Sequence, residues 1–120
     1  VGGMIAQSVA AQAPGRVAGL VLSNTAAKIG TAEAWQARMD AVQTGGMTSI
    51  SEAVLDRWFP ASLRTQPQAL PWLTMLQRCD AAGYIGTCRV LAAADLRAAA
   101  ATLSMPALVF GGIRGSGDAG

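Results

Sequence analysis

The stretch VGGMIAQSVAAQAPGRVAGLVLS, residues 1–23, decides the fold expected for this chain. Two adjacent glycines open it, and a helical pattern follows over residues 3–13, in which Ile5 and Val9 stand four positions apart. A Pro-Gly pair ends the helix. The continuous apolar run at 17–23 is typical of a short strand that is buried on both faces. The stretch therefore predicts a helix that packs closely against a parallel sheet.

The glycine pair at the helix entrance raises the question of what precedes it. A strand, a sharp turn and a helix form the nucleophile elbow G-x-S-x-G, whose glycines flank a reactive serine because side chains there would clash with the adjoining elements. We expect this serine immediately before Val1, which makes Gly2 the second glycine of the motif and the chain a fragment. The alternative is that Gly2 and Gly3 only allow the helix to approach the sheet.

The sequence between Ser23 and Met105 shows helical patterns and no strand. Thr31 is expected to cap a helix whose apolar face carries Trp35, Met39 and Val42. Ser49 with Glu52 predicts a capping box for the next helix. The buried stripe of this helix is expected to comprise Val54, Leu55, Trp58 and Phe59. Two further helical stretches carry Leu73, Met75 and Leu76, and then Tyr84, Ile85, Cys88 and Leu91.

A second buried strand is predicted at 106–111, where proline occupies the first position, at which strands tolerate it. Asp95 is expected to cap the short helix that leads to this strand. The chain thus contains two strands of the α/β type, far apart in the sequence, with an all-helical insertion between them.

Composition limits the classes of protein that the chain can belong to. Of 120 residues, 52% are hydrophobic and 13% are charged, which is typical of part of a larger protein or of an alanine-rich composition. The nine lysines and arginines are scattered, so we expect no nucleic-acid partner. No apolar stretch is long enough to span a membrane, and the start does not resemble a signal peptide.

Metal and redox chemistry have little support in the sequence. Cys79 and Cys88 are too far apart for a CxxC motif and there is no histidine, so we expect no metal site. We interpret both cysteines as buried or idle thiols in a reducing compartment, the cytoplasm. The absence of histidine also means that a Ser-His-Asp triad cannot be completed within this chain.

Nearly the whole chain, up to about Gly112, resembles the α/β-hydrolase superfamily and within it the 3-oxoadipate enol-lactonases. The resemblance is carried by the helix after the elbow and by the segments LVLSNTAAKIG, TAEAW, AVLDRWF, DLR and PALVFGG. It implies a partial α/β-hydrolase fold with two adjacent parallel strands, flanking helices and a helical cap. The core would comprise residues 1–29 and 94–120, and the helical cap residues 30–93.

The resemblance also implies a reaction, the hydrolysis of a small carboxylated lactone in the β-ketoadipate pathway of aromatic catabolism, without a cofactor. A serine attacks the lactone, a histidine takes its proton and an aspartate orients the histidine. Val1 stands where the family has a backbone donor to the oxyanion. The family's aspartate position falls near Gly115, and Asp118 lies nearby but in the wrong place. This polypeptide alone is therefore expected to be inactive.

Three side chains are candidates for substrate binding. Trp35 follows the loop after the first strand and is expected to form an apolar wall over the substrate ring, with core packing as the alternative. Lys28 and Arg57 are candidate partners of the substrate carboxylate, with a solvated surface charge as the alternative.

Two other functions remain open at the level of the sequence. The parent protein is either an enol-lactonase or another cap-bearing α/β-hydrolase, such as an esterase or a haloperoxidase-like enzyme. Alternatively, the chain is a non-catalytic helical interaction module that melts cooperatively by itself. A partial hydrolase is instead expected to self-associate through its exposed sheet edges.

Overall fold

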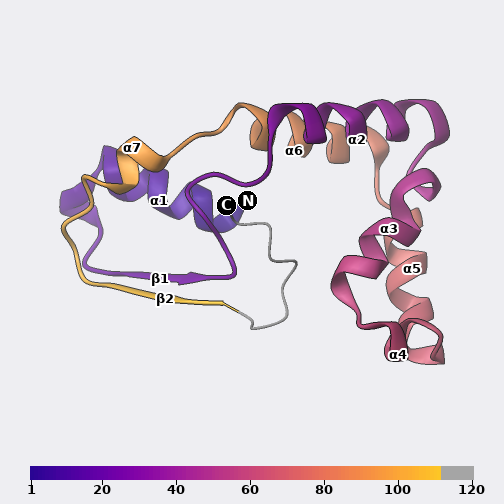
Figure 1. The fold of residues 1–120 in the computed structure, drawn as a ribbon. Coiled ribbons are helices and arrows are strands. Elements are labelled where there is room, and N and C mark those ends of the chain that lie inside the picture. Colours follow the sequence, from indigo (N-terminus) through magenta and orange to yellow (C-terminus); the bar gives the residue numbers. More distant parts are fainter. Residues whose placement is uncertain (112–120) are drawn as a thin grey trace. The chain divides into compact units, whose positions relative to one another are not determined.

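A computed structural model describes residues 1–111 and divides the chain into two compact units (Figure 1). The first unit comprises Val1–Gly30 and the chain from Ala93 onward, and the second comprises Thr31–Ala92. Each border of the two units differs by one residue from the expected border, which was 29/30 before the helical unit and 93/94 after it. The assignment of the second unit as a cap over an active site stays a prediction.

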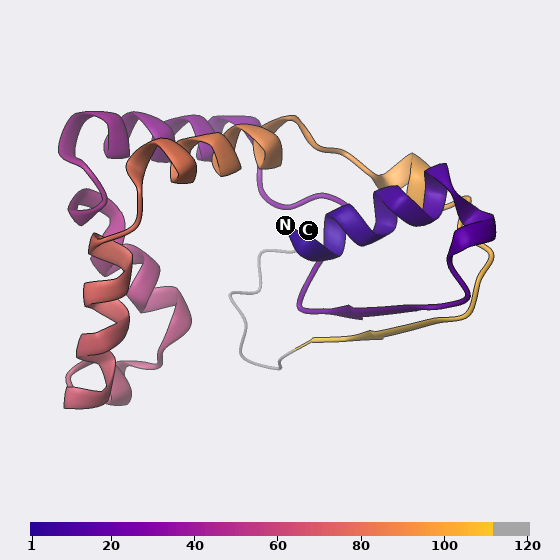
Figure 2. The same ribbon diagram turned by 180° about the vertical axis from the view of Figure 1, so that it is seen from behind.

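The first unit contains two short parallel strands, β1 (Leu20–Ser23) and β2 (Ala107–Phe110). Leu20 pairs with Ala107, and Ser23 with Phe110. The helices of this unit lie on one side of the strand pair in Figure 1 and in Figure 2: α1 (Gly2–Gln12) and α7 (Arg97–Ala100), with the 3-10 turn η1 (Pro14–Arg16) after α1. The prediction of two neighbouring parallel strands with flanking helices is confirmed, although both strands are shorter than expected.

The burial of the first unit differs from the expected pattern. Leu20 is buried, but Val21 is 67% exposed and every residue of β2 is exposed, so the expectation of strands buried on both faces is wrong for the described chain. The reason is that α1 packs on one face of β1 only, and among the described residues no helix packs against β2. On α1 the buried face is formed by Met4, Gln7 and Ala10, whereas the expected Ile5 and Val9 are exposed.

The second unit is entirely helical. Its elements are α2 (Ala32–Gly45), α3 (Thr48–Trp58), α4 (Ala61–Arg64), η2 (Pro67–Ala69), α5 (Leu70–Gln77) and α6 (Ala81–Ala93), the last ending at the border of the unit. The side chain of Thr31 accepts a hydrogen bond from the N–H of Ala34 at 3.2 Å, which confirms the predicted N-cap of α2. Gly46, with φ +67°, ends α2, as the sequence predicts.

The core of the second unit lies where α3 packs against α2 and α5. Its buried members are Val42, Met47, Ile50, Val54, Leu55, Ala69 and Leu76. Trp58, which we expected on the buried stripe of α3, is about half exposed, and so is Met75 on α5. At Trp58 the reason is that α3 ends there, and Phe59 packs against the core in its place, with its ring centre 6.2 Å from that of Trp72.

Two predicted helix caps are wrong by one residue or more. Helix α3 already begins at Thr48, so Ser49 lies inside its first turn, and its hydroxyl is 2.7 Å from the carbonyl oxygen of Gly46 instead of capping the helix. Helix α7 has Leu96 at its N-cap. Asp95 stands one position earlier, where its carboxylate accepts the N–H of Arg97 at 3.2 Å. Local sequence patterns located these helices but missed their first residues.

Replacement of Gly3 by alanine tests the close approach of α1 to the loop after β1. An added Cβ would lie 2.5–2.6 Å from three side-chain atoms of Thr25, whereas a Cβ at Gly2 meets nothing within 4 Å. We expect Gly3→Ala to lower the free energy of unfolding by about 1–2 kcal/mol, because overpacking costs about 1–3 kcal/mol and better helix propensity offsets up to about 1. Urea unfolding followed by circular dichroism measures this change.

The matched control for this substitution is Gly2→Ala, which we expect to leave the stability unchanged or slightly raised. Equal destabilisation by both substitutions would contradict the proposed contact between Gly3 and Thr25.

Candidate active site

The carboxyl end of β1 and the first turn of α1 meet in the first unit. Open α/β sheets bind their ligands at such strand ends. Asn24, directly after β1, has a φ of +47°, and its N–H donates to the carbonyl of Phe110 at 3.0 Å. Val1, the N-cap of α1, accepts the N–H groups of Met4 and Ile5 at 2.9 and 3.0 Å. The predicted oxyanion position at Val1 therefore starts a regular helix beside the end of the sheet.

Thr25, in the loop after β1, contacts the start of α1. Its side chain lies against Gly3, and its hydroxyl oxygen is buried without a hydrogen-bond partner. The next residue, Ala26, accepts a hydrogen bond at 3.3 Å from the buried side-chain amide of Gln7 on α1. Small and polar residues thus bring the loop and the helix into direct contact.

Lys28, a predicted partner of the substrate carboxylate, lies in the first unit next to a carboxylate of the protein itself. Its ammonium nitrogen is 3.5 Å from Asp95, and the adjacent N–H of Leu96 donates to the carbonyl of Ala27 at 2.8 Å. Asp95 also accepts hydrogen bonds from Arg97, at 2.6 Å for Nη2. Hydrogen bonds from Arg97, and then the charges of Arg97 and Lys28, hold the pKa of Asp95 well below its usual range.

The salt bridge therefore pairs Lys28 with a carboxylate of the same unit, which the sequence did not indicate. It connects the segment that leaves the first unit to the segment that returns to it.

The predicted pocket residue Trp35 lies on α2 and is partly buried. The guanidinium carbon of Arg38 is 5.2 Å from the centre of its ring, within the range of a cation–π interaction. The same guanidinium donates through Nη1 to the hydroxyl of Tyr84 on α6, at 3.3 Å. We call Trp35, Arg38 and Tyr84 the α2–α6 cluster. Arg57, in contrast, is exposed in the last turn of α3.

Arg38 is the residue that the sequence analysis missed. The available signal was its position three residues after Trp35, which places both side chains on the same face of the expected helix. The hydroxyl of Tyr84, 46 positions further along the chain, had no such local signal.

Cys88 follows Tyr84 by about one helical turn and is 1% exposed. Burial raises the pKa of its thiol, while the charge of Arg38 and a hydrogen bond with Tyr84 act in the opposite direction. Of the two cysteines that the sequence led us to interpret as buried or idle thiols, Cys88 is buried and Cys79 is exposed.

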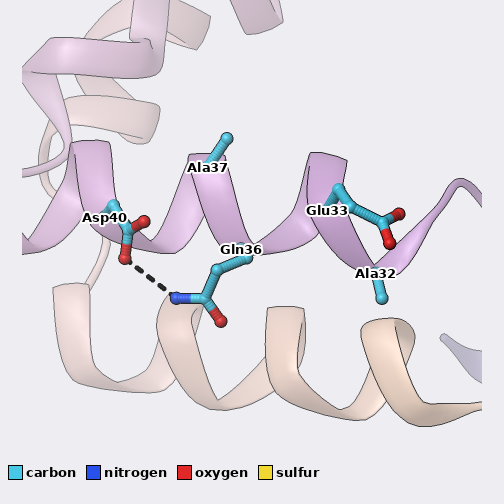
Figure 3. A pocket seen from close by; sticks show the side chains of 5 residues that line it. All are labelled: Ala32, Glu33, Gln36, Ala37 and Asp40. Carbon is cyan, nitrogen blue, oxygen red and sulfur yellow. Dashed lines mark hydrogen bonds between the residues drawn. The ribbon is translucent and has the colours of Figure 1, made fainter.

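A shallow, open hollow lies along α2 (Figure 3). It is lined by Ala32, Glu33, Gln36, Ala37 and Asp40. The side-chain amide of Gln36 donates to the carboxylate of Asp40 at 2.8 Å, as Figure 3 shows. The two carboxylates would repel an anionic substrate, and the hollow lacks the aromatic wall of an ordinary ligand pocket.

Within residues 1–111, no group of three or more His, Cys, Asp or Glu side chains is placed to hold a metal ion. Over the same residues, none of the helices combines the length and the apolar character that crossing a membrane requires. Asp118 lies outside the described residues.

Comparisons with known proteins agree with this architecture. No protein-family model matches the chain. It is 39% identical over 114 residues to 3-oxoadipate enol-lactonase 2 of Acinetobacter baylyi and 32% identical to enol-lactonase 1 of the same organism. Each alignment covers 93% of this chain and 43% of the relative, so the chain spans less than half the length of the curated relatives that it matches.

Solved structures extend the likeness to three dimensions. A hydrolase from Pseudomonas aeruginosa superposes with a TM-score of 0.81 at 34% identity, over 92% of this chain and 43% of that one. The enol-lactonase from Burkholderia xenovorans gives 0.80 at 36% identity, over 93% of this chain and 44% of that one.

The parallel strand pair, its flanking helices and the helical unit inserted between the strands are parts of a known architecture, and the chain belongs to the α/β-hydrolase superfamily. Within that superfamily, its relatives are the 3-oxoadipate enol-lactonases. The resemblance inferred from the sequence is thereby confirmed.

Thiol reactivity tests the environment of Cys88. We expect one thiol per native chain, that of Cys79, to react rapidly with a disulfide reagent, because Cys88 is buried and its raised pKa keeps it protonated. In denaturant both thiols should react. The control variant Cys79→Ser should lose the rapid phase of the reaction. If two thiols of the native chain reacted rapidly, Cys88 would not be buried by the packing of α6 as described.

Proposed function

We propose that this chain is part of a serine hydrolase that opens a carboxylated enol-lactone. In this proposal the first unit supplies part of the catalytic core, and the second unit is the helical cap over the active site. The observation that carries the proposal is the 39% identity to an enol-lactonase over 93% of this chain, because an alignment of that extent includes both units.

The proposed chemistry uses the start of α1. The serine of the elbow would stand directly before Val1, and the histidine would come from outside this chain, which has none. The first N–H groups of a helix have no partner within it, and the backbone donor at the Val1 position would stabilise the oxyanion that forms when the serine attacks the lactone. The regular helix that begins at Gly2 supports this role.

We propose the α2–α6 cluster as the substrate-binding part of the second unit. Trp35 would form the apolar wall, and Arg38 would bind the substrate carboxylate, because a guanidinium offers two parallel donors to a carboxylate. Its contacts with Trp35 and Tyr84 orient the guanidinium before the substrate arrives. Arg38 is favoured over Lys28, which Asp95 already pairs, while Arg57 remains a second candidate.

The chain by itself should show no lactonase activity. Loss of the serine or the histidine of a triad costs about a millionfold in turnover. The pure 120-residue chain should therefore hydrolyse an enol-lactone no faster than buffer does, and hydrolysis well above background would contradict the proposal. Size-exclusion chromatography of the same preparation checks for the self-association that the exposed residues of β2 favour.

The binding role of Arg38 can be measured in a chimera in which residues 1–111 replace the matching segment of the Acinetobacter baylyi enol-lactonase 2. We expect the chimera to open the enol-lactone. Arg38→Met should raise KM for this substrate by about 10- to 100-fold, since hydrogen bonds to charged groups contribute about 1.5–3 kcal/mol. A neutral ester of similar size should be affected by less than about threefold.

Arg89→Met in the same chimera is the matched control, because Arg89 is an exposed arginine of α6 that is given no role in binding, and it should leave the KM for both substrates unchanged. If Arg38→Met raised KM equally for the lactone and for the neutral ester, Arg38 would be a structural residue and not a partner of the substrate carboxylate. A chimera that prefers the neutral ester would favour another cap-bearing hydrolase over an enol-lactonase.

A further inference from the structure

Gln7 is a polar residue on the buried face of α1, between Met4 and Ala10. Only 4% of it is exposed, although glutamine is ordinarily a surface residue. Its side-chain nitrogen lies 3.1 Å from the carbonyl oxygen of Gly3 and 3.3 Å from that of Ala26. The first acceptor belongs to the first turn of α1 and the second to the loop after β1. A single buried amide therefore connects two segments that the chain separates by 19 positions.

The glycine at position 3 makes the same connection possible. The side chain of Thr25 occupies the space in which a Cβ of residue 3 would lie, 2.5–2.6 Å from it. The loop can therefore approach the backbone of α1 only because Gly3 has no side chain, and Gln7 supplies the hydrogen bond that holds it there. An apolar residue of the same size at position 7 would fill the volume but donate to neither carbonyl.

We propose that Gln7 is a positioning residue that holds the first turn of α1 against the loop at the carboxyl end of β1, and so determines where the backbone at Val1 lies. The consequence for catalysis rests on the proposed function, because only in such a hydrolase does the Val1 position contribute to the oxyanion site. The structural part of the inference stands without it. A glutamine that only filled the interface would leave the helix start in place when replaced by methionine.

Hydrogen exchange of the 120-residue chain tests the structural part. Gln7→Met keeps the volume and removes both donated bonds. We expect the hydrogen-bonded amides around this contact, those of Met4, Asn24 and Leu96, to exchange about five- to tenfold faster, the factor for an ordinary hydrogen bond. The second unit should be unchanged. Gln12→Met is the matched control, because Gln12 lies exposed on the same helix and donates to Ser8 at 2.7 Å.

The positioning role is overturned if the amides of Met4, Asn24 and Leu96 exchange as in the wild type, or if exchange accelerates equally over the whole chain. Gly3→Ala offers a second route if the methionine variant does not fold, since the added methyl group pushes the same loop away while Gln7 is retained. It should accelerate exchange at the same three amides. Protection of these residues in both variants would refute the connection.

The catalytic part is tested in the chimera with the Acinetobacter baylyi enzyme. Gln7→Met should lower kcat by about 10- to 100-fold and change KM by less than about twofold, because a small displacement of an oxyanion donor acts on the transition state rather than on substrate binding. Gln12→Met should change neither constant. Unchanged kcat, or a rise in KM alone, would overturn the positioning role. An inactive wild-type chimera would refute the proposed function, and the exchange experiment would still decide the role of Gln7.

Discussion

The parallel pairing of Leu20–Ser23 with Ala107–Phe110 is the constraint on which the first unit depends. Parallel neighbours cannot be joined by a tight turn, so the connection must leave the sheet and return to its opposite end. Here residues 24–106 make this connection and include the whole helical unit. The hydrogen bonds of Leu20 with Pro106 and of Asn24 with Phe110 extend the pairing at both ends. The pairing therefore determines where the chain leaves the sheet and where it comes back.

The segments that leave and return are held together next to the sheet. The salt bridge of Lys28 with Asp95 and the backbone bond of Leu96 with Ala27 connect them. An exposed ion pair contributes little to stability, so we attribute their arrangement mainly to the backbone bond and to the packing of α1 with α7. At the same end of β1, the contacts of Gln7 and Gly3 bring the loop onto α1. The candidate site thus lies where the chain is held by several independent contacts.

The second unit brings together residues of a different kind. The α2–α6 cluster combines an aromatic ring, a cation and a phenol hydroxyl. The hollow along α2 carries the carboxylates of Glu33 and Asp40. Two neighbouring sets of residues on one helix therefore differ in charge, and the proposed substrate-binding role rests on the cationic one.

The sequence by itself determined the elements that depend on local patterns. The two strands, the helix after the glycine pair and the Thr31 cap follow from runs, periodicity and capping chemistry within a few residues, and the family follows from motifs spread along the chain. The tertiary structure alone decided which face of α1 is buried, that α3 begins before Ser49, that Trp58 is exposed, and that Arg38 meets Tyr84. The buried face of α1 and the contact of Arg38 with Tyr84 depend on residues far apart in the chain, and the energy of such contacts outweighs the small local preferences from which a sequence is interpreted. The start and the end of α3 differ from the expectation by a residue or two, which is the usual uncertainty of helix ends.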